Sequence, residues 1–198
     1  MSIADWAEYT ARTILEEPLP RRWAHTQGVA ARARSLAPIL GADAGLLTAA
    51  AWLHDIGYSP PLARTGFHPL DGARYLRDAE HAAPMLCRLV ARHSGAITEA
   101  AERGLARELA AEFRPARRDL DDALIYCDMT TGPDGQHLPV ARRLAEIRVR
   151  YAPEHPVSCA IARSAPLLTA AVSQVSLKLA AATPTALPTC DLDLAAAA

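Results

Sequence analysis

The segment AWLHDIGYSP, residues 51–60, joins an apolar run to an adjacent histidine and aspartate. The small and apolar residues at 46–53 lead directly into His54 and Asp55. Such a run is typical of a buried helix, where burying polar side chains without partners costs on the order of several kcal/mol. The rest of the chain must therefore supply partners for His54 and Asp55.

The composition indicates one globular domain without a strong overall electrostatic field. The chain has 198 residues, with 21 basic and 22 acidic side chains and a formal net charge of −1. This length supports a hydrophobic core, and the balanced charge argues against a nucleic-acid or membrane partner. Lys178 is the only lysine, and the chain contains neither a P-loop nor a GxGxxG motif.

The sequence shows no recognisable signal peptide or membrane-spanning stretch, and its cysteines form no CxxC pair. The segment MSIADWAEYT, residues 1–10, lacks the basic and apolar regions of a signal peptide, and no uninterrupted apolar stretch reaches the ~20 residues that span a bilayer. We therefore expect a soluble cytoplasmic protein. The cysteines are scattered without a CxxC pair, which favours buried small side chains over disulfides or metal ligands: Cys87, Cys127, Cys159 and Cys190.

Apolar residues recur at spacings of three and four, and alternating β-branched runs are missing, which predicts an all-α fold. The spacing, with the proline and glycine positions, predicts helices over residues 2–17, 21–40, 43–55, 69–79, 84–93, 97–112, 119–130, 138–151 and 156–181. Pro38 and Pro166 fall inside two of these ranges and would kink or interrupt them. Two loops stand out, at residues 57–67 and 131–138.

We expect a single domain over residues 1–182, with its motifs at 20–132 and C-terminal helices at 138–181. The low-complexity tail, residues 183–198, is expected to be disordered. The long last helix would close the core or form a dimer face, so the protein is expected to be a monomer or a homodimer.

Further helices each direct one metal-binding side chain toward the interior. His25 shares a helix face with apolar residues four and eight positions later, and His93 follows apolar residues three, four and seven positions earlier. Asp128 likewise follows apolar residues at offsets of three and four, and His68 begins another helix beside Pro69.

A core can bury one hydrogen-bonded histidine at little cost. Each of these histidines, taken alone, could therefore be an ordinary core residue. The whole set is different, because neutral imidazoles and carboxylates that converge on a divalent cation satisfy one another. The sequence therefore predicts a buried metal centre that provides the partners of His54 and Asp55. Such a mixed ligand set suits Fe, Mn, Co, Ni or Zn better than Ca.

The order and spacing of His25, the pair His54-Asp55, and Asp128 resemble the HD-domain superfamily of metal-dependent phosphohydrolases. The pair stands in the HDIG form at residues 54–57. The resemblance covers about residues 20–132 and implies a compact helical bundle. Among subgroups, the segments HTQGVAARA, LLTAAAWLHDIG, LCRLVARHSGA and DALIYCDMTTG are similar to those of small hydrolases of symmetrical dinucleoside tetraphosphates.

The resemblance also implies roles for the individual residues. Members of the family with two metals add two histidines between the His-Asp pair and the last aspartate, and His68 and His93 fall there. Asp55 would then bridge two divalent transition-metal ions, with His54 beside it in the catalytic centre. His25, His54 and Asp128 would complete one metal site, and His68 and His93 the other. If His68 instead touched substrate or capped its helix, one ion would remain.

The implied reaction is hydrolysis of a small phosphorylated substrate, such as a nucleotide, by a metal-activated water. Candidate substrate-binding residues near the ligands are Arg22, Arg64, Arg92, Thr131 and Asp134. Each arginine could equally be a solvated surface charge, and Asp134 a turn residue. Asp121 could hydrogen-bond a ligand histidine or serve the first turn of its helix.

Two other functions fit the same ligand pattern. One is an HD-type mixed-valent di-iron oxygenase, which would need iron and consume oxygen. The other is a non-catalytic regulatory module that binds a nucleotide, which a degraded ligand set would favour. Every expected ligand is present in this sequence.

Overall fold

The structure is a computed structural model that describes residues 1–182, and this part of the chain is helical apart from its loops. The elements are α1 (Ile3–Leu15), α2 (Pro20–Ser35), α3 (Ala37–Leu40), η1 (Gly41–Asp43), α4 (Ala44–Leu53), η2 (Ile56–Tyr58), α5 (His68–Asp78), α6 (Pro84–Arg92), η3 (His93–Gly95), α7 (Ala96–Glu102), α8 (Ala106–Glu112), α9 (Arg118–Met129), α10 (Val140–Arg150) and α11 (Pro156–Ala182). Within residues 1–182, extended pairing is limited to a single bridge between Thr131 and His137. The predicted all-α bundle is confirmed, and the predicted tail, residues 183–198, lies outside the described residues.

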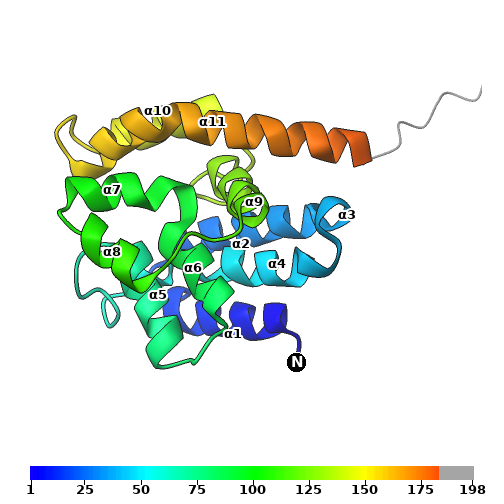
Figure 1. Ribbon diagram of the computed structural model, residues 1–198, viewed down its shortest axis with the longest axis horizontal. Coiled ribbons are helices and arrows are strands. Elements are labelled where there is room, and N and C mark those ends of the chain that lie inside the picture. Colours follow the sequence, from blue (N-terminus) through cyan, green and yellow to red (C-terminus); the bar gives the residue numbers. More distant parts are fainter. Residues whose placement is uncertain (183–198) are drawn as a thin grey trace, which may run out of the picture.

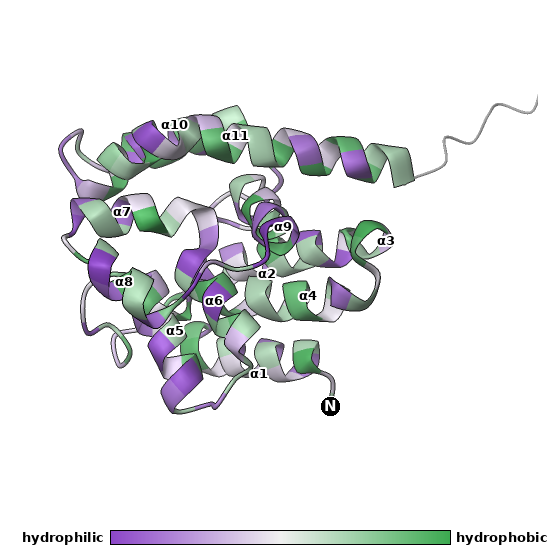
Figure 2. Cartoon of the chain, viewed as in Figure 1, coloured by the Kyte–Doolittle hydropathy of each residue, from purple (hydrophilic) through white to green (hydrophobic). Residues whose placement is uncertain are grey.

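Helix α4 lies at the centre of the bundle. Its residues 47–53 are all buried, as expected for an apolar run without a solvent-facing side. It packs against α1 on one side and against α2 and α9 on the other, and α11 covers α9. Figure 1 shows this order from α1 at one edge to α11 at the other, and Figure 2 shows mainly hydrophobic residues along α4.

Two of the predicted helical ranges are interrupted: the break near Pro38 was expected from the sequence, and the break near Gly104 was not. The range 21–40 breaks at Leu36, because Pro38 lies in the first turn of the separate helix α3 and cannot continue the hydrogen bonding of α2. The range 97–112 divides into α7 and α8 around Gly104, whose φ of +73° leaves the helical region. Pro166, by contrast, lies inside a continuous α11.

Helix α11 closes the core with one face and leaves the other exposed. Ile161, Leu168, Val172 and Val175 are buried, and the helix packs on α9, α7 and α10. By length and composition, α11 could cross a membrane, although 22% of its apolar window is buried inside the protein; α2 taken together with residues 37–58 passes the same test as a bent pair. Polar residues such as Ser164, Thr169 and Gln174 interrupt α11, so it is not an uninterrupted apolar stretch. The core helix of a soluble protein can meet the same criteria, so length and composition alone do not assign α11 to a membrane.

The ends of several helices meet on one side of α2. His54 caps the C-terminus of α4, His93 follows the last residue of α6, and Asp128 lies in the last turn of α9. His68 opens α5, while His25 lies within α2. The fold therefore brings five segments, far apart in sequence, to one place.

Candidate metal centre

Asp55 lies at the centre of a cluster of histidines. Its Oδ2 is 3.3 Å from Nε2 of His54 and 3.8 Å from Nε2 of His25. Its Oδ1 is 3.2 Å from Nε2 of His68 and 3.9 Å from Nε2 of His93. The carboxylate thus presents one oxygen to each of two histidine pairs.

The cluster forms two groups of possible metal ligands. His25, His54 and Asp128 make one group, and Asp55, His68 and His93 make the other. Within each group, one ligand atom from every residue lies within 4.8 Å of the others. The structure therefore brings together all the ligands that the resemblance implied. His68 is half-buried, and the others are buried.

Three of the imidazole rings are held by hydrogen bonds that leave Nε2 facing the cluster. In each ring Nδ1 lies within hydrogen-bonding distance of a backbone carbonyl oxygen. The pairs are His25 with Gly132 (3.0 Å), His54 with Ala51 (2.8 Å) and His93 with Val90 (2.7 Å). Because a carbonyl only accepts, Nδ1 carries the proton, and in the neutral ring Nε2 has a free lone pair. Metal-binding histidines are oriented in this way.

Nε2 of His54 provides a direct test of whether a metal fits. This atom is buried and has no hydrogen-bond partner among the described residues, although it lies 3.3 Å from Oδ2 of Asp55. An unpaired polar atom in the core is costly, whereas coordination of a cation satisfies it. Four imidazoles and two carboxylates are also a suitable ligand set for divalent transition metals. The residues present therefore fit such an ion.

The electrostatics favour the metal-binding protonation state at four of the possible ligands, the two carboxylates and the rings of His25 and His93. His54 differs, because Asp55 outweighs burial and raises the pKa of its ring, so a bound metal would have to displace that proton. Burial alone would raise the pKa of Asp55, but Arg22 and His54 outweigh it and hold the pKa well below its usual range. The pKa of Asp128 is likewise well below its usual range, because His25 outweighs burial. Burial lowers the pKa of His25, and it lowers the pKa of His93 to about 3 with help from His68. Carboxylates and neutral imidazoles are the forms that metals require.

The close approach of two backbones positions His68. A Cβ atom on Gly57 would lie 2.1 Å from the carbonyl oxygen of His68 and 2.6 Å from the amide nitrogen of Gly72. Only glycine therefore allows η2 to lie against the first turn of α5. The ring of Tyr58, the next residue, stacks on the ring of His68 with centroids 3.9 Å apart.

Arg22 is the sequence-predicted substrate residue that the structure brings to the cluster. Its Nη1 donates to Oδ2 of Asp55 at 2.7 Å, and its guanidinium lies 4.0 Å from the centre of the Tyr58 ring. Asp55 and Tyr58 outweigh burial and raise the pKa of Arg22, so its positive charge is permanent.

Arg64 and Arg92 do not reach the cluster. Arg64 is exposed, and its backbone N–H donates to Asp71. The guanidinium of Arg92 donates two hydrogen bonds to the carbonyl oxygen of Phe113, which turns it away from the adjacent His93. Sequence proximity to a ligand was misleading here, because neighbouring residues on a helix point in different directions.

Thr131, Asp134 and Asp121 also have other contacts. The hydroxyl of Thr131 donates to the carbonyl oxygen of Cys127, and Asp134 is exposed and accepts from Arg21 at 2.8 Å. Oδ1 of Asp121 is buried without a hydrogen-bond partner among the described residues. The ligand histidines of the preceding paragraphs use backbone carbonyls instead, so the suggested Asp121–histidine hydrogen bond is not formed by them.

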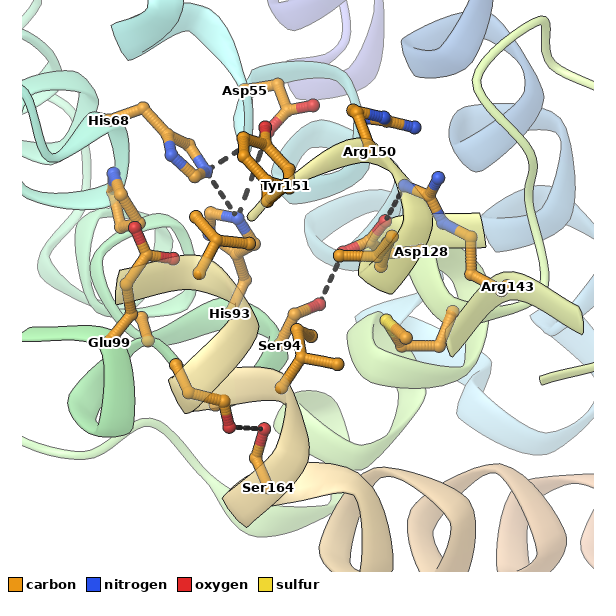
Figure 3. Close-up of a pocket in the computed structure, with 18 of the residues that line it drawn as sticks. Asp55, His68, His93, Ser94, Glu99, Asp128, Arg143, Arg150, Tyr151 and Ser164 are labelled. Atoms are coloured by element: carbon orange, nitrogen blue, oxygen red, sulfur yellow. Dashed lines mark hydrogen bonds and ion pairs between the residues drawn. The ribbon is translucent and has the colours of Figure 1, made fainter. Parts of the chain in front are cut away.

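Two contacts to Asp128 were missed by the sequence analysis. The hydroxyl of Ser94 donates to Oδ2 of Asp128, and Nη2 of Arg143 lies 3.6 Å from its Oδ1 (Figure 3). Ser94 follows His93 directly, adopts a φ of +51° and contacts Asp128 on α9. Arg143 is buried on α10, and its position four residues before the buried Ile147 was the signal that could have indicated this.

These side chains line a cavity of about 80 Å³ next to the possible ligands. Arg22, Asp55, His68, His93 and Asp128 line it, together with residues from α7, α10 and α11. Figure 3 shows Arg150 and Tyr151 above the cavity, Glu99 at its side and Ser94 below Asp128. The cavity therefore joins the cluster of possible metal ligands to a set of arginines.

Over residues 1–182 the chain is a helical bundle that brings two groups of histidines and aspartates together, mostly at helix ends, and this defines a helical domain with a candidate metal centre. A family model, HD domain, matches residues 22–128, which is more than half of the 198-residue chain. The chain belongs to the HD-domain family, whose members bind divalent metals and are typically metal-dependent phosphohydrolases. Comparisons with curated proteins and with solved structures found no match.

Proposed function

We propose that this protein is a phosphohydrolase that cleaves a phosphate ester or anhydride of a nucleotide or similar small substrate with the help of two divalent transition-metal ions. The observation that carries the proposal is the place of Asp55, whose two oxygens face separate histidine pairs at 3.2–3.9 Å. A carboxylate in this position can serve two cations at once. The narrower resemblance to dinucleoside tetraphosphate hydrolases stays a prediction.

The proposed ligands are His25, His54 and Asp128 for one ion and His68 and His93 for the other, with Asp55 shared. Bound there, the ions would polarise a phosphoryl oxygen and lower the pKa of a bound water. Hydrolysis then adds the water oxygen to phosphorus, breaks the bond from phosphorus to the leaving oxygen, and leaves that oxygen with a proton. No side chain has to act as a nucleophile.

The arginines beside the cavity supply the charge that a phosphate requires. Arg22, Arg143 and Arg150 all line it, and the first two also contact the carboxylates of Asp55 and Asp128. Arginine binds phosphate through two parallel N–H donors and remains charged at every working pH. Their role is to hold the phosphoryl group and to stabilise the negative charge that develops during the reaction.

The test is hydrolysis of a panel of nucleotides and phosphate esters by protein reconstituted with Mn²⁺, Fe²⁺, Co²⁺, Ni²⁺ or Zn²⁺. We expect phosphate release that requires a metal and falls by at least about a thousandfold in Asp55→Ala, since this residue would serve both ions. Release of phosphate at the same rate by Asp55→Ala would overturn the proposal. Substrate-dependent oxygen consumption with iron, without phosphate release, would favour an oxygenase instead.

A further inference from the structure

His68 differs from the other possible ligand histidines in how its ring is held. The rings of His25, His54 and His93 are fixed by hydrogen bonds from Nδ1 to backbone carbonyl oxygens. The polar contacts of His68 instead involve Nε2, which lies 3.2 Å from Nε2 of His93 and 3.2 Å from Oδ1 of Asp55 (Figure 3). Within residues 1–182, no hydrogen bond at Nδ1 therefore fixes the orientation or the tautomer of this ring.

The ring of His68 is held by stacking on Tyr58. The two rings are almost parallel, with an interplanar angle of 16° and centroids 3.9 Å apart. The other aromatic neighbours of His68 among the described residues are tilted and more distant, with the centroid of Phe67 at 6.3 Å and that of His93 at 5.1 Å. The Tyr58 ring is thus the surface that sets the plane of the His68 ring.

Tyr58 is itself fixed through both its backbone and its ring. Its amide nitrogen donates to the carbonyl oxygen of Asp55 at 3.1 Å, so its backbone is tied to the residue that would serve both ions. The guanidinium of Arg22 lies 4.0 Å from the centre of its ring, and Arg22 also pairs with Oδ2 of Asp55 at 2.7 Å. A cation beside the face of a tyrosine ring is attracted to it, and the attraction is stronger where water is excluded. The Tyr58 ring therefore has a fixed position relative to Asp55.

From these contacts we infer that Tyr58 is the positioning residue of His68, and that its aromatic ring, not its hydroxyl group, holds Nε2 of His68 toward Asp55. The inference rests on the proposed function, because it treats His68 as a ligand of an ion. It further assigns the weaker of the two ion sites to Asp55, His68 and His93. One ligand of that site is half-buried and is held by stacking rather than by a hydrogen bond, so more of its freedom is lost when an ion binds.

Titration of metal-free protein with Mn²⁺, followed by the EPR signal of the free ion, tests the inference. Tyr58→Leu removes the aromatic ring, whereas Tyr58→Phe keeps the ring and removes only the hydroxyl group. We expect two binding steps in the wild type. Tyr58→Leu should weaken the second step about tenfold or more and the first by less than about twofold, and Tyr58→Phe should leave both within about twofold of the wild type.

Tyr75→Leu is the matched control. It removes a half-buried tyrosine ring from α5, the helix that His68 begins. The hydroxyl of Tyr75 donates to Glu80, and Tyr75 does not line the cavity beside the cluster. Both binding steps of this variant should stay within about twofold of the wild type. A loss equal to that in Tyr58→Leu would overturn the inference, because disturbance of α5 would then explain the effect.

A double-mutant cycle separates positioning of His68 from a general effect on the fold. His68→Ala removes the ring that Tyr58 orients, so Tyr58→Leu should change binding of the remaining ion by less than about twofold in this background. A further tenfold loss there would overturn the inference. In metal-free protein, the NMR signals of the His68 ring protons should move in Tyr58→Leu but not in Tyr58→Phe, because only the first removes the stacked ring.

The outcomes separate this inference from the proposed function. If Tyr58→Leu selectively weakens the second ion but no metal-loaded protein releases phosphate from any substrate, the assignment of Tyr58 holds and the hydrolase proposal fails. If phosphate esters are hydrolysed but Tyr58→Leu binds both ions as the wild type does, or Tyr58→Phe loses as much affinity as Tyr58→Leu, the hydrolase proposal holds and the assignment of Tyr58 fails. Fewer than two bound ions in the wild type would overturn both.

Discussion

Nη1 of Arg22 donates a hydrogen bond of 2.7 Å to Oδ2 of Asp55, and the two side chains are only 20% and 4% exposed. The same oxygen faces His54 and His25. Arg22 therefore compensates the charge of the carboxylate that is central to the proposed metal centre. The loss in free energy of unfolding when Arg22 is replaced should therefore depend on whether cations are bound.

Arg22→Met tests this coupling. In metal-free protein we expect the free energy of unfolding to fall by about 3 kcal/mol, because a buried carboxylate loses its main counter-charge. With Mn²⁺ bound, the loss should be smaller, since the cations lie next to the same carboxylate. Urea unfolding with and without chelator measures both values. Arg34→Met is the control, because its pair with Glu8 is exposed and should contribute under about 1 kcal/mol. An equal loss in both metal states would contradict the coupling.

Gly57→Ala tests the contact that positions His68. The new Cβ would collide with the backbone at His68 and Gly72, so α5 has to move. We expect a loss of about 2–3 kcal/mol in stability and of about one metal equivalent, as the group containing His68 is disturbed. The control is Gly45→Ala, whose Cβ would meet nothing closer than 3.7 Å and should leave the metal content unchanged. Full metal content in Gly57→Ala would show that His68 is not a required ligand.

Ser94 is predicted to orient Asp128 through its hydroxyl group. Ser94→Ala and Ser94→Gly both remove this donor, and each should weaken binding of the ion assigned to His25, His54 and Asp128 about 10–100-fold in a competition titration with a chelator. Ser94→Gly should be the more stable variant by about 1 kcal/mol, because the residue has a φ of +51°. Wild-type metal affinity in Ser94→Gly would mean that the backbone turn, not the hydroxyl, positions Asp128.

Asp121 provides a pH-dependent test away from the ligands. Burial raises the pKa of Asp121 to about 6, from 3.8. The folded protein therefore holds this proton more tightly than the unfolded chain does, so the contribution of Asp121 to stability is greatest below about pH 4 and is lost as the pH rises through 6. Asp121→Asn should gain about 1–2 kcal/mol at pH 7.5 and nothing at pH 4. Thermal unfolding at both pH values measures this.

The control for Asp121 is Asp119→Asn on the same helix. Hydrogen bonding from Arg117 lowers the pKa of Asp119, so removing this charge should not stabilise the protein at pH 7.5. If both variants gave the same change at both pH values, the burial of the Asp121 carboxylate would not be the cause.

The ligand cluster was predictable because each ligand lies at a fixed position relative to an apolar helix face. His54 follows a run of buried residues in α4, and His93 and Asp128 end helices whose apolar faces are buried. These relationships can be identified from local sequence. The order of the ligands along the chain, with the HDIG sequence at residues 54–57, then indicates the family. The resulting all-α family assignment is confirmed by the match at residues 22–128.

The residues around the ligands were harder to predict, because their positions depend on tertiary packing. Arg143 and Tyr151 come from α10 and its end, and no sequence spacing links them to Asp55. Arg92 is adjacent to a ligand but binds the carbonyl oxygen of Phe113, 21 residues away. The break at Gly104 was also missed, since apolar periodicity continues across it.

The most direct test of the account is the metal content of purified, reconstituted protein, measured by elemental analysis for the wild type and Asp55→Ala. Asp134→Ala is the control, because Asp134 is exposed and pairs with Arg21. We predict about two transition-metal equivalents in the wild type and the control, and less than one in Asp55→Ala. No metal in the wild type, or two equivalents in Asp55→Ala, would contradict a centre in which Asp55 serves two ions.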